Sequence, residues 1–413
     1  MTATETEAFA LAPTASGRSM RSGSPFAKAL ASLWRVGGLT LVEPSGQARA
    51  IGPQTPRSGD PIVWRLRHWR AVRRMITRGD IGFAEGYVAG DWDTPDLTKL
   101  LLAFAENYDH LERMVGGNPL ARGLDAVVHA LSGNTRRGSR RNIVAHYDLG
   151  NDFYAGWLDP GMTYSAALFE HPDQILEEAQ RAKYAALADA CDIRPGQSVL
   201  EIGCGWGGFA EYLARERGVT VTAITLSPSQ KAWADRCIRQ AGLEDRVSIQ
   251  LIDYRDVPGT FDRIVSVEMF EAVGEAYWPT FFETVRDRLT PGGRAALQII
   301  TIQDALLPVY RRRPDFIQMH VFPGGMLPSE ERLEAVTSDA GLSGQVVRRF
   351  GADYAETLRR WRIAFDAAAA PGKDERFRRL WRYYLAYCEA GFLSGRIDVV
   401  HMTVEASPTP AHA

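Results

Sequence analysis

Apolar runs and helical stretches alternate along the second half of the chain. Five runs have the length and composition of buried strands: VLEIG (199–203), VTVTAITL (219–226), VSIQLID (247–253), FDRIVSVEM (261–269) and RAALQIITI (294–302). Buried strands separated by helices predict an α/β fold with a doubly wound, mainly parallel sheet covered on both faces. Ligands bind such sheets beyond the carboxyl ends of the strands. The turns after these runs are therefore the expected place for a site.

The rest of the pattern divides the chain into unequal parts. Residues 1–60 are rich in Ser, Gly, Pro and Ala, which predicts a flexible tail with a weak strand. Residues 61–132 predict a small α+β domain whose clearest helix is capped by Asp96 or Thr94. A Gly-, Ser- and Arg-rich linker follows at 133–144, and 145–413 forms the α/β domain. Beyond residue 303 the alternation stops, and aromatic-rich helices at 303–400 are expected to cover the substrate.

Charge is distributed unevenly, although the formal net charge is only −2. Residues 1–150 carry 19 Lys and Arg against 14 Asp and Glu. Six arginines form a cluster in the sequence near Trp64 and Trp69: Arg65, Arg67, Arg70, Arg73, Arg74 and Arg78. This composition suits an anionic membrane surface or nucleic acid, and a solvated helix face remains an equal alternative.

Cysteine spacing and hydropathy limit the remaining classes. The four cysteines form no C-x-x-C pair, which argues against a disulfide scaffold and a zinc site, so no metal is predicted and a reducing cytoplasm fits. The amino-terminal stretch has no sustained apolar core and does not resemble a signal peptide. No run approaches the roughly 20 apolar residues that span a bilayer, so we expect any membrane contact to be peripheral, at the inner face.

The strongest chemical signal is VLEIGCGWGGFAEYLA at 199–214. A buried strand delivers Glu201, and Gly203, Gly205 and Gly207 then form a tight turn before a helix. Glycine lets the backbone approach a ligand closely and adopt positive φ. The spacing differs from the G-x-G-x-x-G dinucleotide fingerprint. It resembles the first motif of Rossmann-like class I methyltransferases, which implies S-adenosylmethionine as the cofactor.

Two further turns complete the expected cofactor site. The second strand ends in TLSPSQ, where Gln230 replaces the acid that normally holds the ribose hydroxyls and where Thr225 and Leu226 are also expected to bind the cofactor. After the third strand, DYRDV places Tyr254 and Arg255 where they could stack on and flank an adenine ring. A capped turn that begins at Asp253 is the structural alternative.

These turns, together with other segments, resemble the cyclopropane-fatty-acyl-phospholipid synthase family. The resemblance extends from about Gly82 to Glu405. Its segments are GFAEGYVAGDWD (82–93), AHYDLGNDFYAGWLDPGMTYSAALF (145–169), TLSPSQ, DYRDV, SVEMFEAVG (266–274), FPGGMLPS (322–329) and FGADYAETL (350–358). It implies methyl transfer from S-adenosylmethionine to a cis double bond in a phospholipid acyl chain, after which loss of a proton closes a cyclopropane ring.

The resemblance also assigns roles to residues. Tyr164 and Ser165 are implied to bind the cofactor. A bound bicarbonate is implied to act as the base, held by Glu271 and Tyr354. Backbone amides near Ala166 and Ile300 are implied to help hold it.

Two positions depart from the family pattern, and a third is a candidate catalytic residue. Ala166 stands where the family commonly has Cys, and Gln298 stands where it commonly has His in the fifth strand. Gln can donate a hydrogen bond but cannot become cationic, so a methyl-branched or methylene product is the alternative to cyclopropane. Cys388 lies where relatives carry a suspected catalytic cysteine, although a buried Cys is more often a small hydrophobe.

Two other classes of function compete with this interpretation. A nucleic-acid methyltransferase would use the arginine-rich stretch, but the expected catalytic part is acidic and lacks an N-P-P-[YF] motif, so no nucleic-acid partner is predicted. An inactive lipid-binding module would explain Gln298, but the cofactor motifs are intact. A homodimer is left open.

Overall fold

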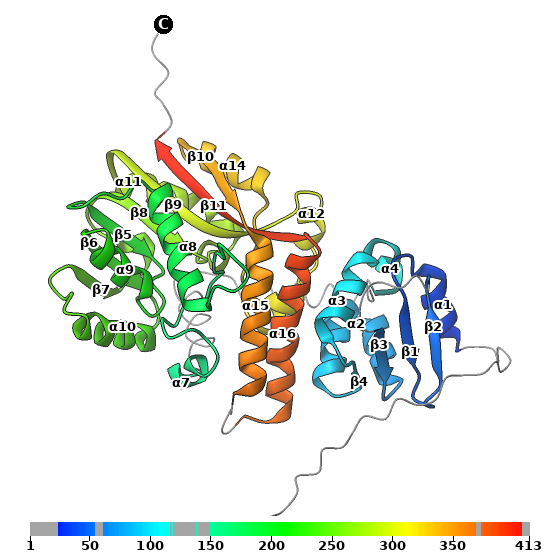
Figure 1. The fold of residues 1–413 in the computed structure, drawn as a ribbon. Coiled ribbons are helices and arrows are strands. Elements are labelled where there is room, and N and C mark those ends of the chain that lie inside the picture. Colours follow the sequence, from blue (N-terminus) through cyan, green and yellow to red (C-terminus); the bar gives the residue numbers. More distant parts are fainter. Residues whose placement is uncertain are drawn as a thin grey trace, which may run out of the picture.

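A computed structural model describes residues 24–53, 61–115, 149–368 and 373–406, together with residues 118 and 138. It contains two β-sheets, each with its own helices (Figure 1). No helix in the described part of the chain is long and apolar enough to cross a membrane. The predicted linker at 133–144 lies, apart from residue 138, outside the described residues.

The larger sheet has seven strands in the order β10-β11-β9-β8-β5-β6-β7. The five strands predicted from the apolar runs are confirmed: β5 (Ser198–Ile202), β6 (Thr220–Thr225), β7 (Val247–Leu251), β8 (Phe261–Val267) and β9 (Leu289–Ile302). They pair in parallel. The strand order reverses at β5, which has β6 on one side and β8 on the other. This reversal is where such sheets bind ligands.

Helices cover both faces of the sheet because successive strand residues point to opposite sides. Val199 packs with one layer, whereas the next residue, Leu200, packs with the other. The first layer is α8 (Leu176–Ala190), α9 (Gly208–Glu216) and α10 (Pro228–Gln240). The second is α11 (Trp278–Arg288) and α14 (Glu330–Asp339).

The region after residue 303 corrects one expectation. It contains the short helices α12 (Leu307–Tyr310) and α13 (Phe316–His320) and the long helices α15 (Gly351–Ala367) and α16 (Glu375–Leu393). It also supplies two strands of the sheet, β10 (Leu342–Arg349) and β11 (Ile397–Ala406). β11 pairs antiparallel with both β9 and β10. The stretch is therefore partly sheet, because the end of the chain returns to cover the edge of β9.

The smaller sheet has the order β2-β1-β3-β4. Its strands are β1 (Leu39–Val42), β2 (Ala48–Ile51), β3 (Ile62–Leu66) and β4 (Trp92–Asp93). Its helices are α1 (Pro25–Leu33), α2 (Arg70–Val88), α3 (Leu97–Glu106), which Asp96 caps, and α4 (Tyr108–Val115), while α7 (Asn151–Ala155) precedes the large sheet. The predicted tail at 1–60 is wrong for residues 24–53, because Leu30, Trp34 and Leu41 from this stretch are buried in a core that the small domain shares with α15 and α16. Residues 1–23 lie outside the described residues.

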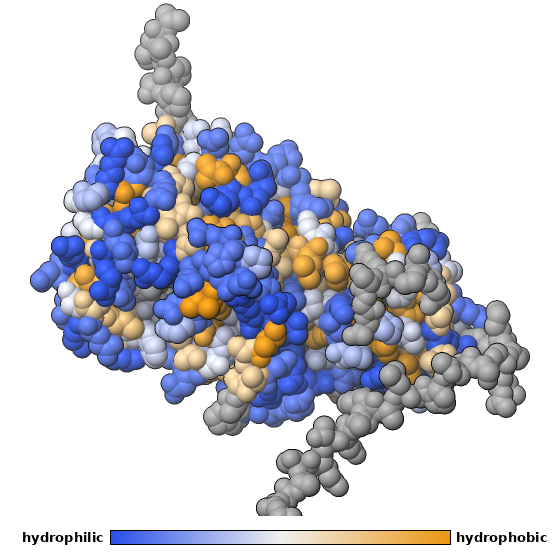
Figure 2. Space-filling view, in the orientation of Figure 1, coloured by the Kyte–Doolittle hydropathy of each residue, from blue (hydrophilic) through white to orange (hydrophobic). Residues whose placement is uncertain are grey.

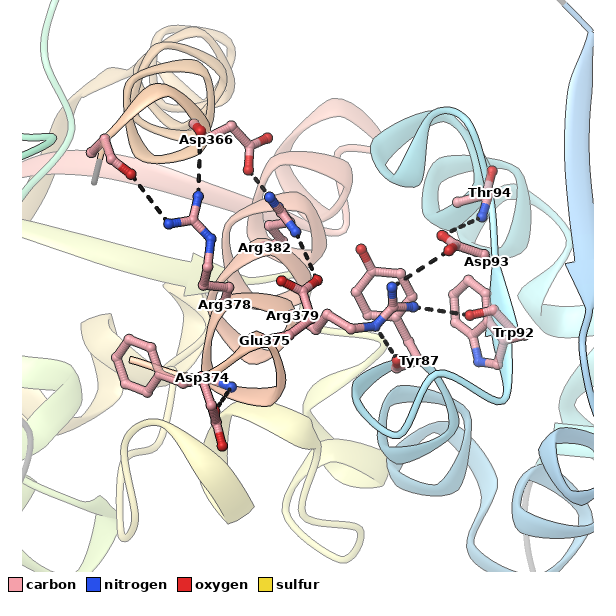
Figure 3. A network of polar contacts seen from close by, with 12 residues as sticks. Tyr87, Trp92, Asp93, Thr94, Asp366, Asp374, Glu375, Arg378, Arg379 and Arg382 are labelled. Atoms are coloured by element: carbon pink, nitrogen blue, oxygen red, sulfur yellow. Dashed lines mark hydrogen bonds and ion pairs between the residues drawn. The ribbon is translucent and has the colours of Figure 1, made fainter. Parts of the chain in front are cut away.

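Helices α15 and α16 stand between the two sheets (Figure 1). Figure 3 shows how Arg379 of α16 reaches the small domain. Its guanidinium donates to the carbonyl oxygens of Tyr87 at 2.6 Å and Trp92 at 3.0 Å, and it lies 3.9 Å from the centre of the Tyr87 ring. Farther along α16, Glu389 accepts a hydrogen bond from Thr98 of α3 at 2.9 Å. The small domain is thus bonded directly to the helices that cover the large sheet.

Candidate active site

One cavity of about 810 Å³ joins the carboxyl end of the large sheet to the small domain. The end at the sheet is lined by the glycine turn after β5. The wall continues over aromatic side chains of α15 and α16, including Tyr354, Tyr384 and Phe392. Phe83 and Phe104 of the small domain line the far end. The small domain was not expected to form a wall of the site, and it does so.

The glycine turn has the geometry that its spacing predicts. Gly203 and Gly207 have φ of 87° and 91°, in the region that favours glycine. A Cβ on Gly203 would lie 2.8 Å from Cγ of Met269, and one on Gly207 would lie 2.9 Å from Cβ of Ala234. Side chains larger than hydrogen therefore cannot be accommodated at either position without movement.

Most of the predicted cofactor residues line this end of the cavity. They are Tyr164, Ser165, Glu201, Gly203, Gly205, Thr225, Leu226, Gln230 and Tyr254. Thr225 donates to the amide oxygen of Gln230 at 2.9 Å, which fixes the orientation of that amide. Burial raises the pKa of Glu201 to about 8, and its Oε2 has no hydrogen-bond partner among the described residues. An unpartnered buried oxygen here fits a ligand that brings its own donor.

Two predicted cofactor residues lie away from the cavity wall. Gly207 serves as the N-cap of α9 and shapes the turn from behind. Arg255 does not line the cavity either: its guanidinium donates to Asp253 at 2.6 and 2.8 Å and lies over the rings of Tyr254 and Tyr277. The carboxylate two residues before it holds the guanidinium, so the structure favours the capped-turn alternative for Arg255.

A carboxyl group that the sequence analysis missed lies beside the aromatic part of the cavity. Glu268 directly follows β8 and lines the cavity. Its Oε1 accepts from the backbone N–H of Ala166 at 2.8 Å and from Nε2 of Gln298 at 2.7 Å. Its Oε2 accepts from the hydroxyl of Tyr354 at 2.6 Å. Burial raises the pKa of Glu268, and these donors oppose that rise.

Glu271 occupies a different place from the one predicted. It lies one turn farther on, does not line the cavity, and accepts a hydrogen bond from the backbone N–H of Ile300. Burial, reinforced by the charge of Glu268, raises the pKa of Glu271 to about 8, so this group is mainly neutral at pH 7. The structure therefore brings Tyr354, Gln298 and Ala166 together around Glu268 rather than around Glu271.

Lys183 of α8 is a second group that the sequence analysis missed. Its side chain is fully buried, and its Nζ donates to Oγ of Ser165 at 2.7 Å. Burial lowers the pKa of Lys183 to about 8, while the negative charges of Glu268, Asp159 and Glu201 oppose that fall. A lysine between apolar positions of an amphipathic helix was the available signal.

Cys388 lines the cavity from α16, and burial raises the pKa of its thiol far above the usual range. The thiol is therefore not ionised at neutral pH, and the structure places it as part of the apolar wall.

Comparison with known proteins identifies the family. The family model described as mycolic acid cyclopropane synthetase matches residues 134–402. This chain belongs to that family. Cyclopropane-fatty-acyl-phospholipid synthase of Escherichia coli is 37% identical over 351 residues, which cover 82% of this chain and 86% of that protein. Tuberculostearic acid methyltransferase UfaA1 of Mycobacterium tuberculosis is 39% identical over 380 residues, which cover 89% of this chain and 87% of that protein.

Solved structures agree with the fold. Mycolic acid cyclopropane synthase CmaA1, solved with SAH and CTAB, matches with a TM-score of 0.59 and 31% identity. The match covers 97% of that structure but 64% of this chain. The predictions of the family, of a class I methyltransferase fold and of S-adenosylmethionine as the methyl donor are confirmed. The roles assigned to individual residues stay predictions.

Proposed function

We propose that this enzyme transfers the methyl group of S-adenosylmethionine to the cis double bond of an unsaturated phospholipid acyl chain and forms a cyclopropane fatty acid. The observation that carries the proposal is the single cavity in which the glycine turn, the aromatic wall and a carboxyl group meet. The E. coli relative has this activity in its name. An elongated apolar space next to the cofactor site suits an acyl chain better than a polar substrate.

The residues of the chain contribute mainly by positioning. Gln230 and Glu201 would hold the cofactor so that its sulfonium methyl faces the aromatic part of the cavity. The alkene then attacks the methyl carbon in line, a step that depends on holding the two reactants together. The aromatic rings of Tyr164, Tyr354 and Tyr384 line the cavity and would stabilise the carbocation that forms. The hydroxyls of Tyr164 and Tyr384 are 2.8 Å apart, which keeps both rings in place.

Bicarbonate, which the family resemblance implies, does not fit this site. Its expected donors are already bonded to carboxyl groups of the chain: Ala166, Gln298 and Tyr354 to Glu268, and Ile300 to Glu271.

A methyl-branched or methylene product is the second candidate. Gln298 favours it, because a neutral amide in place of an imidazole changes the group that donates to Glu268 at the cavity wall. The relative named tuberculostearic acid methyltransferase gives the candidate further support. The two products differ only in the fate of the cation after methyl transfer.

We propose that the small domain carries the surface that faces the membrane. Phe26, Trp69 and Ile76 form a shallow apolar patch, and Trp69 and Ile76 are 44% and 53% exposed. Arg73 is on the same helical face, and among the described residues neither it nor Arg65 forms an ion pair. Four of the six clustered arginines instead pair with acids: Arg67, Arg70, Arg74 and Arg78. The face drawn in Figure 2 is mainly hydrophilic, with hydrophobic residues in small separate areas.

Peripheral attachment at the inner face of the cell membrane and a cytoplasmic location are part of this proposal. A homodimer stays a prediction.

Titration calorimetry with S-adenosylmethionine, followed by transfer of its radiolabelled methyl group to dioleoyl-phospholipid vesicles and to DNA, tests the proposal. We expect cofactor binding and label in lipid alone. Label in DNA, or none in lipid, would contradict it. Mass spectrometry of the labelled lipid separates a cyclopropane from a branched or methylene product.

A further inference from the structure

The anion site implied by the resemblance is filled by the protein itself. Three donors from distant parts of the chain converge on one carboxyl group: the N–H of Ala166, the amide of Gln298 on β9 and the hydroxyl of Tyr354 on α15. All three distances lie between 2.6 and 2.8 Å, which is the range of charge-assisted hydrogen bonds. This set of donors suits a carboxylate or a carboxylate-like anion, and Glu268 supplies it.

The backbone at Glu268 explains why this carboxyl group, and not that of Glu271, reaches the cavity. Glu268 has φ of 48°, a conformation that non-glycine residues seldom adopt. Its N–H donates to the carbonyl oxygen of Gln298 at 2.9 Å, which anchors the left-handed turn at the end of β8. Such unfavourable backbone geometry is found where function requires a particular side-chain direction.

His401 fixes the orientation of the Gln298 amide group, so that its NH2 group points toward Glu268. His401 of β11 is paired in register with Gln298, and its Nε2 lies 3.0 Å from the amide oxygen of Gln298. Burial lowers the pKa of His401 to about 3, so the ring is neutral and presents an N–H to that oxygen. The amide nitrogen of Gln298 therefore faces Glu268. A neutral donor binds the carboxylate without the positive charge that would make it a weaker base.

We propose that the Glu268 carboxylate is the catalytic base of the reaction and takes the place of bicarbonate. This inference rests on the proposed function. In the first step the alkene electron pair forms a bond to the methyl carbon while the sulfonium–carbon bond breaks, which leaves a neutral thioether and a carbocation. In the second step a C–H bond of the transferred methyl breaks, its electron pair closes the ring, and the proton goes to Glu268. Release of that proton to solvent completes the cycle.

The departures at Ala166 and Gln298 then have a common explanation. Ala166 contributes its backbone N–H, so its side chain is not needed. Gln298 needs only to donate, because the anion is covalently part of the chain and no cation is required to attract it from solution. Both positions are compatible with an active enzyme whose base is covalently attached and cannot leave the site.

The deciding experiment measures methyl transfer from radiolabelled S-adenosylmethionine to dioleoyl-phosphatidylglycerol vesicles in carbon-dioxide-depleted buffer, with and without added bicarbonate. We expect the wild-type rate to change less than twofold on addition of bicarbonate. A wild-type rate that rises tenfold or more would overturn the proposal, and this arm needs no variant. Absence of label from wild-type lipid under both conditions would instead refute the proposed function.

Variants separate a base from a positioning residue. Glu268→Gln keeps the shape of the side chain, and we expect its rate to fall about 100-fold or more. Glu268→Gly suits the left-handed backbone and vacates the anion site, so bicarbonate or formate should restore its rate at least tenfold. Glu283→Gln, at an exposed position of α11, is the control with an unchanged rate. Calorimetry with S-adenosylhomocysteine, expected to agree within threefold for all variants, verifies folding.

Two outcomes with the variants would overturn the proposal. One is a Glu268→Gln enzyme that keeps more than a tenth of the wild-type rate. The other is a folded Glu268→Gly enzyme that neither anion restores, since Glu268 would then act only by holding Tyr354 and Gln298 in place.

Discussion

Replacing Arg379 with Ala should weaken the attachment of the small domain to the helices that cover the active site. Arg379 is on α16, and its side chain is 13% exposed. It donates to two backbone carbonyl groups of the small domain, lies over the Tyr87 ring and forms an ion pair with Asp93 at 3.4 Å (Figure 3). The substitution removes all four contacts and leaves the carbonyl oxygens of Tyr87 and Trp92 without this donor.

The expected loss follows from the kinds of contact. A hydrogen bond to a charged group contributes about 1.5–3 kcal/mol. A partly buried cation–π contact contributes about 1 kcal/mol. The ion pair with Asp93 adds little, because Asp93 is 25% exposed. Contacts of one side chain do not add fully, so we expect Arg379→Ala to lower the free energy of unfolding by about 3 kcal/mol. Arg379→Lys keeps the charge but not the fork of donors, and it should lose about half of that.

Urea unfolding followed by tryptophan fluorescence measures the loss. Calorimetry with S-adenosylhomocysteine measures the cofactor site separately. We expect cofactor affinity to be unchanged, because that site is built on the large sheet, while lipid methylation falls with the loss of the cavity wall. Arg382→Ala is the matched control on the same helix. Among the described residues Arg382 pairs with Asp366 and Glu375, both well exposed, so its loss should be about 0.5 kcal/mol. A loss below about 1 kcal/mol for Arg379→Ala, or a parallel fall in cofactor affinity, would refute the reasoning.

Three further predictions test other parts of the molecule. Gly207→Ala should lower the free energy of unfolding by about 1–3 kcal/mol and weaken S-adenosylhomocysteine binding, and unchanged affinity by calorimetry would contradict it. Glu271→Gln should be more stable than wild type by a margin that grows as pH rises from about 4.5 to 8. The raised pKa of Glu271 makes the wild type lose stability across that window, so a margin in urea midpoints that does not change with pH would contradict this assignment. The double variant Trp69→Ala, Arg73→Gln should bind phosphatidylglycerol vesicles about fivefold or more weakly in a sedimentation assay. The control Arg194→Gln, at an exposed position, should bind as wild type does. Equal binding of the double variant and wild type would contradict the proposed membrane-facing surface.

The local pattern of apolar residues was sufficient to predict the parallel strands of the large sheet. It was not sufficient to predict β10 and β11 at one edge of that sheet. β5, β6, β8 and β9 contain runs of buried residues and lie between helices, which few other structures can accommodate, while β7 at the edge alternates buried with more exposed residues. β10 has largely exposed side chains, and β11 follows a long aromatic helix, so neither resembles the buried runs. Their place in the sheet depends on the antiparallel pairing of β11 with β9, a contact between segments about 100 residues apart. The same limit applies to residues 24–53, which pack in one core with distant residues such as Trp64.

The cofactor end of the site was more predictable than its reacting end for a physical reason. The glycine turn is one continuous segment, and its spacing alone requires the positive φ values that the structure has. At the reacting end, Glu268 and Glu271 belong to one short segment and differ only in direction. That direction depends on a left-handed backbone at a non-glycine residue, for which the sequence has no marker. Lys183 did have a marker, since a lysine interrupts the apolar face of α8, but its contact with Ser165 arises only in the fold.

The environment of Glu268 decides whether a tethered carboxylate can replace a diffusible base. Three hydrogen bonds and the buried charge of Lys183 each favour the ionised form and lower its basicity. Burial acts in the opposite direction and is the largest single effect, so the pKa of Glu268 stays above its ordinary value. A neutral Gln298 is consistent with this balance, because an imidazolium in its place would add a second positive charge and weaken the base further. The amide of Gln298, which departs from the family pattern, is therefore compatible with an internal carboxylate base.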